Sequence, residues 1–252
     1  MIQVYQGDCL RWMQNIPDKS VDMILCDLPY GRTKNKWDKI IDPAALWEQY
    51  ERIIKDNGAI VLFTMQPFTA QMIMSNPKLY RYEWIWEKTQ AKGHMNAKKM
   101  PMRAHENVEV FYKHLPTYNP QKTTGHKRIH SVRNYMREAG NGCYGAEDRH
   151  TVYDSTERYP RSVQKFGNGD QAKRFHVTQK PVSMCEYFIL TYTNAGETVL
   201  DNCMGSASTG VACINTGRSF IGGEIEPETY KKAVERMRAA GGTVEEMEVE
   251  AN

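Results

Sequence analysis

The stretch VDMILCDLPYG, residues 21–31, decides the fold. Its first six residues form a nearly unbroken apolar run, which predicts a strand buried on both faces. A turn follows at once, at the place where ligands bind in an open α/β sheet. In that turn Asp27 offers an acceptor for an amino group, Pro29 stiffens the loop, and Tyr30 offers a flat face for stacking. The same residue types are also typical of a plain strand-ending turn.

Strands and helices alternate on both sides of this stretch. Further strands are predicted at residues 59–63, 82–87, 107–112, 198–200 and 220–223. Helices are predicted at residues 43–55, 182–193, 205–216 and 227–240. Such alternation predicts an α/β protein with a Rossmann-like, doubly wound and mostly parallel sheet.

Residues 115–175 differ from the rest of the chain. They contain eleven Lys and Arg but six Asp and Glu, an excess of 11 − 6 = +5 in a chain whose net charge is +3. Their apolar residues show little periodicity, which predicts an irregular insertion outside the sheet. A basic insertion fits contact with a polyanion, although a solvated basic loop has the same composition. We therefore expect four parts: residues 1–114, the insertion 115–175, residues 176–240, and an acidic, mobile tail at 241–252.

The bulk composition excludes several classes of protein. The hydrophobic fraction of 40% and the charged fraction of 25% are ordinary for a soluble globular protein. No apolar stretch approaches the roughly 18–20 residues of a membrane helix, and the N-terminus has no signal-peptide pattern. The six cysteines form no CxxC pair, and His176 stands in no ligand spacing. We expect no metal site, reduced thiols and a cytoplasmic location.

Two further motifs lie in the C-terminal part. The run LDNCMGSAST, residues 200–209, leads from a predicted strand through small residues into a helix. Small residues let a ligand approach the backbone, although the run is not the GxGxxG fingerprint and also fits a tight turn. Gly222-Gly223-Glu224 ends the next predicted strand, where an acidic residue can accept hydrogen bonds from ribose hydroxyls. An exposed charge at a strand end is the alternative.

Taken in order, these motifs resemble the β-class amino-methyltransferases of DNA. GDCL (7–10) is similar to the N-terminal GD segment of that family, and DLPY (27–30) to its D-P-P-Y motif. WEKTQ (86–90) and AHENVEVFYK (104–113) resemble segments that close the family's catalytic half, so residues 1–114 would be the catalytic half and residues 176–240 the cofactor-binding half. HVTQKP (176–181), otherwise a polar linker, resembles the H-P-T-Q-K-P motif, which is the most specific match. DNCMGSAST (201–209) and FIGGEIEPETY (220–230) resemble the D-P-F-x-G-x-G-T cofactor loop and the strand that follows it.

The resemblance implies a fold of the S-adenosylmethionine-dependent methyltransferase type and specific roles for individual residues. The catalytic residues would be Asp27, Leu28, Pro29 and Tyr30. S-adenosylmethionine would be bound by Asp8, Asp27, Lys180, Asp201, Asn202, Met204, Gly205, Ser206, Ser208, Thr209 and Glu224. Residues 115–175 would recognise the target, with Arg128, Arg133 and Arg137 as candidate contacts to DNA.

Partners and location also follow from the resemblance. The substrate would be double-stranded DNA, and the protein would be a monomer or homodimer without membrane contact. It would act in the cytoplasm of a bacterium, encoded there or by a phage, with a cognate restriction endonuclease as a candidate partner.

Four residues, in three of the motifs, depart from the family pattern. Leu28 and Val177 each replace a Pro, and Ala207-Ser208 stands where a second Gly is usual. Leu28 is compatible with a role for its backbone carbonyl, whereas the altered loop puts cofactor affinity in question.

The sequence leaves more than one candidate for the atom that receives the methyl group. Family members that act on cytosine N4 more often carry Ser in place of Asp27, which favours N6 of adenine. Methylation of cytosine C5 is disfavoured because no Pro-Cys pair supplies its nucleophile. An RNA or protein methyltransferase, and a non-catalytic DNA-binding homologue, are weaker alternatives.

Overall fold

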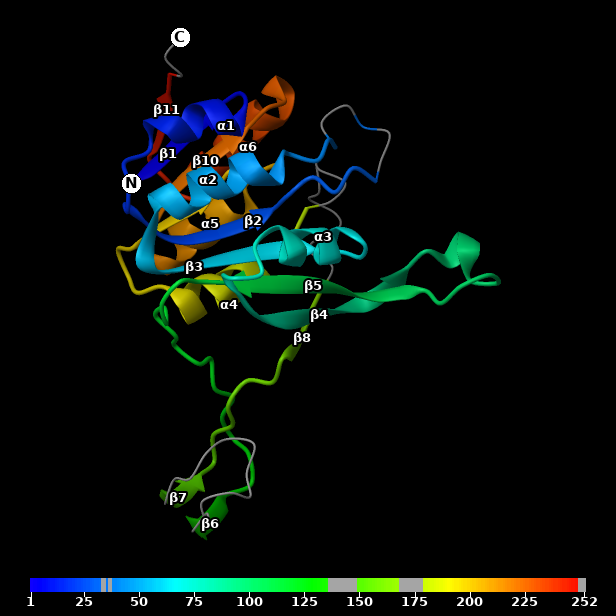
Figure 1. The fold of residues 1–252 in the computed structure, drawn as a ribbon, viewed down its shortest axis with the longest axis vertical. Helices are drawn as coiled ribbons and strands as arrows, with labels where there is room; N and C mark the ends of the chain where they lie inside the picture. The colour runs from blue at the N-terminus through cyan, green and yellow to red at the C-terminus, as the bar shows by residue number, and fades with distance from the viewer. Residues whose placement is uncertain (33–34, 36–37, 136–148, 168–178, 249–252) are drawn as a thin grey trace. The chain divides into compact units, whose positions relative to one another are not determined.

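A mixed sheet forms the framework of the larger of two compact units, Met1–Asn119 with Ser162–Asn252. The computed structural model describes residues 1–32, 35, 38–135, 149–167 and 179–248. The strands of this sheet are β1 (Ile2–Gln6), β2 (Val21–Asp27), β3 (Ile54–Thr64), β4 (Tyr80–Lys92), β5 (Arg103–Phe111), β8 (Val163–Phe166), β9 (Thr198–Asp201), β10 (Ser219–Glu224) and β11 (Val244–Met247). Their order is β11-β1-β10-β9-β2-β3-β5-β4-β8 (Figure 1).

The sheet is parallel over most of its width. Each pairing from β11 across to β3 is parallel, whereas β5 is antiparallel to both β3 and β4. At the far edge, β8 pairs with β4 in parallel. The predicted doubly wound, mostly parallel sheet is therefore confirmed.

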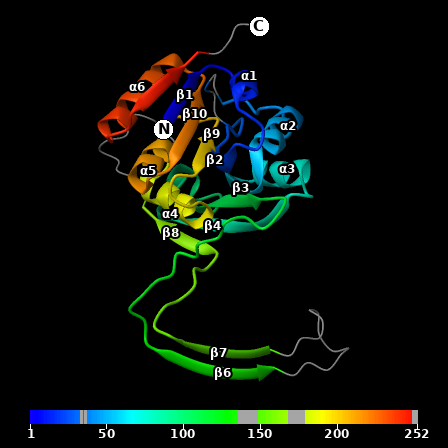
Figure 2. The ribbon, with the colours of Figure 1, turned by 90° about the vertical axis from the view of Figure 1, so that its left-hand side faces the viewer.

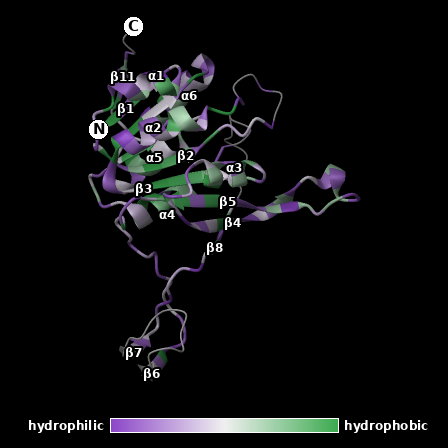
Figure 3. Cartoon of the chain, viewed as in Figure 1, coloured by the Kyte–Doolittle hydropathy of each residue, from purple (hydrophilic) through white to green (hydrophobic). Residues whose placement is uncertain are grey.

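Helices cover both faces of the sheet (Figure 2). One face carries α1 (Cys9–Trp12), the 3₁₀ turn η1 (Met13–Asn15), α2 (Pro43–Ile53) and α3 (Phe68–Ser75). The other face carries α4 (Val182–Tyr192), α5 (Ser208–Thr216) and α6 (Pro227–Ala239). Each face has its own apolar core, and Figure 3 shows hydrophobic residues concentrated in the strands between the helices. Among the described helices, none is long and apolar enough to span a membrane.

Local sequence explains where α2 begins, and strand pairing explains where it ends. The carboxylate of Asp42 accepts a hydrogen bond from the backbone N–H of Ala44 at 3.3 Å, and Pro43 occupies the first turn, where its missing N–H costs nothing. The helix ends at Ile53, two residues before the predicted end, because Ile54 pairs with Val21 as the first residue of β3. The pairing between strands thus overrides the helical periodicity.

Two predictions about the boundaries of the sheet are wrong. Val163–Phe166 lies within the predicted insertion but forms β8, and the indole N–H of Trp86 donates to the Phe166 carbonyl at 3.2 Å. Val244–Met247 lies in the predicted mobile tail but forms β11 beside β1. Both segments are only four residues long, so their own periodicity carries little signal. Pairing with an existing strand edge orders them.

The smaller unit, Pro120–Arg161, contains a two-stranded antiparallel ribbon. Its strands are β6 (Ile129–Tyr135) and β7 (Arg149–Ser155), in register from Ile129↔Ser155 to Tyr135↔Arg149. The prediction of a wholly irregular insertion is therefore wrong for these residues. Val132 and Val152, which pair across the ribbon, are 51% and 59% exposed, so this apolar pair has no buried face of the kind that a periodicity search detects.

Candidate active site

Three strands bring acidic residues to one edge of the sheet. Asp27 ends β2, Asp201 ends β9 and Glu224 ends β10, and these strands are neighbours in the order β10-β9-β2. A cavity of about 870 Å³ lies there. The candidate catalytic and cofactor-binding residues that line it are Asp8, Asp27, Leu28, Pro29, Tyr30, Lys180, Asp201, Asn202, Met204, Gly205, Ser206, Ser208, Thr209 and Glu224. The structure brings all of them together, while their individual roles stay predictions.

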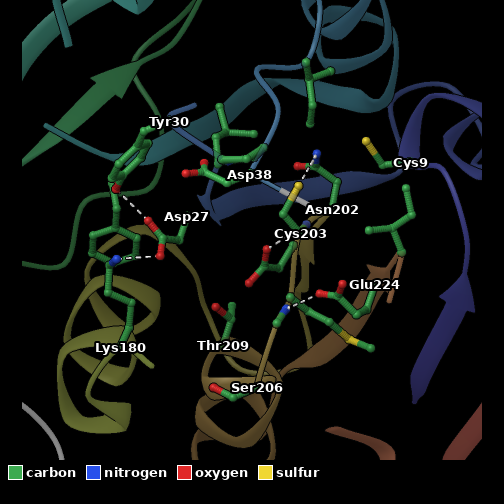
Figure 4. A pocket seen from close by; sticks show the side chains of 18 of the residues that line it. Cys9, Asp27, Tyr30, Asp38, Lys180, Asn202, Cys203, Ser206, Thr209 and Glu224 are labelled. Atoms are coloured by element: carbon green, nitrogen blue, oxygen red, sulfur yellow. Dashed lines mark hydrogen bonds and ion pairs between the residues drawn. The ribbon is translucent and has the colours of Figure 1, made fainter. Parts of the chain in front are cut away.

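Asp27 is held from two sides (Figure 4). The Tyr30 hydroxyl donates to its Oδ1 at 2.6 Å, and the ammonium of Lys180 lies 2.5 Å from its Oδ2. Burial raises the pKa of Tyr30 well above its ordinary value, and the charge of Asp27 raises it further. Tyr30 is therefore a hydrogen-bond donor at neutral pH, and it fixes the orientation of the carboxylate.

Lys180 belongs to a buried chain of alternating charges. Its ammonium also lies 3.5 Å from Oε2 of Glu106, whose other oxygen accepts from Lys88. The side chains of Lys88, Glu106 and Lys180 are 9%, 13% and 10% exposed. Burial lowers the pKa of Lys180, but the carboxylates of Asp27 and Glu106 outweigh burial and raise it above its ordinary value. Lys180 is therefore a permanent cation beside Asp27.

The DLPY loop is fixed by packing and by an aspartate beyond it. The side chain of Leu28 is 4% exposed in the apolar core, and the ring of Tyr30 packs against Phe68 at 5.2 Å between centroids. The backbone N–H groups of Gly31 and Arg32 donate to Oδ1 and Oδ2 of Asp38 at 2.8 and 2.9 Å. Because the Leu28 side chain points into the core, only its backbone is free to face a ligand.

Glu224 is the acceptor that organises the loop after β9. Its Oε2 accepts from the backbone N–H of Gly205 at 3.0 Å, and its Oε1 from that of Glu226 at 2.9 Å. Burial raises its pKa above the ordinary value. Ala207 follows in the same loop with φ = +56°, a left-handed conformation that costs a non-glycine residue roughly 1–2 kcal/mol. Where the family pattern has a second Gly, this chain thus has an Ala in a left-handed conformation that a Gly would adopt without strain.

The remaining residues of this loop are also fixed by contacts. Burial raises the pKa of Asp201 to about 7. The Tyr50 hydroxyl donates to Oδ1 of Asn202 at 2.5 Å, and the Ser208 hydroxyl donates to the Lys180 carbonyl at 2.8 Å. Arg236 donates to the Ser206 carbonyl at 2.7 Å. Across the cavity Asp8 caps α1 by accepting from the backbone N–H of Leu10 at 2.9 Å.

Two of the three candidate DNA contacts lie among the described residues. Arg128 makes two hydrogen bonds of 2.6 Å to the carboxylate of Asp154, from Nε and from one terminal nitrogen. Arg133 lies in β6. Arg137, together with residues 176–178 of the HVTQKP motif, lies outside the described residues.

The sequence of this chain matches a known family of enzymes over most of its length. The DNA methylase family of N6- and N4-methyltransferases matches residues 21–235. The chain belongs to this family. It is a DNA methyltransferase, and the fold, the order of its motifs and the cavity at the carboxyl ends of the strands are those expected of one.

Individual relatives of this methyltransferase extend over nearly its whole length. The type II methyltransferase M.HpaI of Haemophilus parainfluenzae is 27% identical over 246 residues, which cover 92% of the chain and 72% of M.HpaI. The DNA adenine methyltransferase YhdJ of Escherichia coli (strain K12) is 27% identical over 261 residues, covering 94% and 83%. The crystal structure of the M1.HpyAVI–SAM complex superposes with a TM-score of 0.65 at 24% identity, covering 94% and 99% of the two chains. This last likeness shows a shared fold.

Sequence reasoning missed three polar residues of the methyltransferase site: Lys88, Glu106 and Asp38. All three line the cavity. Lys88 and Glu106 stand in segments that resemble the family, but nothing in those segments distinguishes a buried ion pair from two exposed charges. Asp38 has no local signal, because its role depends on the loop folding back onto Gly31.

Proposed function

We propose that this methyltransferase transfers a methyl group from S-adenosylmethionine to N6 of adenine in double-stranded DNA. The observation that carries the proposal is the placement of Asp27. Its carboxylate lines the cavity, is oriented by Tyr30 and is charge-compensated by Lys180. That arrangement suits a group that must accept hydrogens from an amino nitrogen.

The residues around the cavity fit S-adenosylmethionine. Each oxygen of Glu224 accepts one backbone N–H, so each keeps a further lone pair for a ribose hydroxyl. Asp8, Asp201 and Asn202 add polar atoms, while Met204 adds an apolar surface. The cavity volume of about 870 Å³ lies within the usual range of sites for small cofactors.

The bound cofactor would supply an activated methyl group on a sulfonium. The chain's own residues would present the amino nitrogen. An aromatic amino group is a poor nucleophile because its lone pair is delocalised into the ring. Asp27 and the backbone carbonyl of Leu28 would accept its two hydrogens, which favours a tetrahedral nitrogen with a localised lone pair. Tyr30 would stack on a base swung out of the duplex.

Asp27 has the capacity for this task although both its oxygens are already engaged. Each carboxylate oxygen has two lone pairs, and the bonds from Tyr30 and Lys180 use one on each. The permanent cation on Lys180 offsets the cost of holding Asp27 charged in a partly buried site. The carboxylate is thus fixed in place before the base arrives.

The choice of adenine rests on the Asp at position 27 and on the likeness to an adenine methyltransferase of Escherichia coli. N4 of cytosine is the alternative on the same scaffold. The test is to treat plasmid DNA with the protein and S-adenosylmethionine, digest it to nucleosides and identify the product by mass spectrometry. N6-methyladenine is the expected product. N4-methylcytosine would overturn adenine specificity, and an unmodified digest would overturn the activity.

The insertion 115–175 is our candidate for target recognition, on the strength of its basic excess. The likeness to type II methyltransferases supports a cognate restriction endonuclease as a partner. We propose that the protein acts in the cytoplasm as a monomer or homodimer. The order of its parts, with the catalytic half first, the insertion next and the cofactor-binding half last, would be that of the β class.

A further inference from the structure

The tip between β4 and β5 has an unusual composition. Residues 90–105, here called the arm, contain Lys92, Lys98, Lys99 and Arg103 but no Asp or Glu. Every residue from 92 to 105 is exposed. A short 3₁₀ turn, η2 (His94–Asn96), lies in the arm, which Figure 1 shows running out beyond the neighbouring strands. The arm is therefore a cationic projection.

Large apolar side chains are exposed on the same projection. Met95 is 88% exposed, Met100 58% and Met102 41%. Scattered apolar residues on a surface need no explanation, but three within eight residues of one projection suggest a contact surface. Methionine is flexible and adapts to varied surfaces, and apolar wedges of this kind contact bases in several DNA-binding proteins.

The charges of the arm differ from those at its base. Lys88, before the arm, forms a buried ion pair with Glu106. Among the described residues, no ion pair joins Lys92, Lys98 or Lys99 to a carboxylate. The base of the arm is thus electrically compensated, whereas its outer part carries net positive charge that a polyanion would neutralise.

The arm begins at the rim of the cavity. Lys92 and Arg103, which pair across the β4–β5 ladder, line the same cavity as Asp27 and Tyr30. A strand rises roughly 3.3 Å per residue, so Met95, seven residues after Lys88, lies at most about 23 Å from it. That span is about two-thirds of one duplex turn of roughly 34 Å. A base held in the cavity would place its flanking phosphates within reach of the arm.

We infer that the arm is a second DNA-binding element, separate from the insertion 115–175. Its lysines contact phosphates that flank the target base within one duplex turn, and Met95 packs against the duplex within that same turn. The inference rests on the proposed function, because the position of the DNA follows from a base lying in the cavity. DNA is favoured over an acidic protein because the cationic arm starts at the cavity that takes the base.

The test measures DNA affinity against salt concentration for three proteins: the parent, Lys98→Ala/Lys99→Ala, and the control Lys231→Ala/Lys232→Ala. The control removes two exposed lysines from α6. Neither of these lysines lines the cavity. Each phosphate contact contributes about 0.9 to the slope of log K against log salt, so losing two lowers it by about 1.8. We expect that change for the arm variant and the parental slope for the control.

Equal slopes for the arm variant and the control would overturn the inference. A second pair tests the apolar contact: Met95→Ser should weaken binding, while Met95→Leu should bind like the parent. Equal affinity of Met95→Ser and the parent would remove Met95 from the interface. Calorimetric binding of S-adenosylmethionine and methyl transfer at low salt are measured in parallel. If the parent binds DNA but transfers no methyl group, the proposed function is wrong. The comparison of salt slopes still decides whether the arm binds DNA.

Discussion

The ammonium of Lys180 lies 2.5 Å from the carboxylate of Asp27, although the two residues are 153 positions apart in the sequence. The contact joins the DLPY loop to the HVTQKP segment, and so adds a side-chain link between residues 1–114 and 176–240, which also pair through β2 and β9. Glu106 provides a second carboxylate for the same ammonium at 3.5 Å. Lys180 is thus the only described cation that pairs with Asp27, and it ties three separate segments together.

Replacing Lys180 with Met should destabilise the fold. The change leaves the Asp27 and Glu106 carboxylates without their shared cation, and breaking a buried pair commonly costs about 3–5 kcal/mol. Urea denaturation measures the free energy of unfolding. Lys231→Met, at a lysine that is 69% exposed on α6, should stay within about 0.5 kcal/mol of the parent. Equal stability of the two variants would show that Lys180 contributes no buried pairing energy.

Asp27→Asn should separate binding from chemistry. The amide keeps the shape but cannot carry the negative charge that offsets positive charge growing on the target nitrogen. Losing one such electrostatic contact costs on the order of a hundred- to a thousand-fold in rate. Single-turnover methyl transfer at saturating cofactor and DNA measures this, on protein shown by circular dichroism to be folded. A rate within a few-fold of the parent would show that Asp27 is not catalytic and that DLPY is only a turn at the end of a strand.

Glu224→Ala should weaken binding of S-adenosylmethionine. A hydrogen bond to a charged group contributes about 1.5–3 kcal/mol, which corresponds to roughly a ten- to a hundred-fold increase in Kd. Isothermal calorimetry measures the constant directly. Glu228→Ala is the matched control, because Glu228 is 80% exposed in the first turn of α6. Because Glu224 also orders Gly205, the variant's melting temperature has to be measured, and an unchanged Kd in a folded protein contradicts the assignment.

Glu109→Gln should make stability less dependent on pH. Glu109 is buried in β5, where burial raises the pKa of its carboxyl from 4.5 to about 7. Between these values the folded state holds a proton that the unfolded state has released, so stability falls as pH rises from about 4.5 to about 7. Gln mimics the protonated form at every pH. The melting temperature of the variant relative to the parent should therefore be higher at pH 8 than at pH 5, and a constant difference would contradict the assigned pKa.

Neutralising the candidate contacts of the insertion should weaken DNA binding across all sequences. Arg128→Ala/Arg133→Ala/Arg137→Ala removes up to three phosphate contacts, which lowers the salt slope by as much as about 2.7. Arg128 already forms hydrogen bonds with Asp154, so binding a phosphate would require it to give up or share these bonds. Of the three single Arg→Ala variants, that of Arg128 should therefore reduce the salt slope least. Filter binding at several salt concentrations measures the slopes. If the triple variant keeps the parental affinity and slope, the insertion is not the DNA-binding region.

Much of the parallel part of the sheet was predictable because its signals are local. The apolar run before Asp27 predicts β2 by itself, and strand order then brings Asp27, Asp201 and Glu224 to one edge. The segments β8 and β11 were not predictable. Each is short, and each becomes ordered by pairing with a strand that lies far away in the sequence.

The sequence by itself determined the family, the mostly parallel sheet and the residues at the carboxyl ends of its strands, because apolar periodicity and small-residue loops are properties of neighbouring residues. Only the tertiary structure decided that Lys88 and Glu106 are buried with Lys180, that Asp38 holds the loop after Tyr30, and that Ala207 takes a left-handed conformation. The environment of a charge depends on which strands become neighbours. A carboxylate in an alternating strand looks the same in sequence whether it faces water or a buried ammonium.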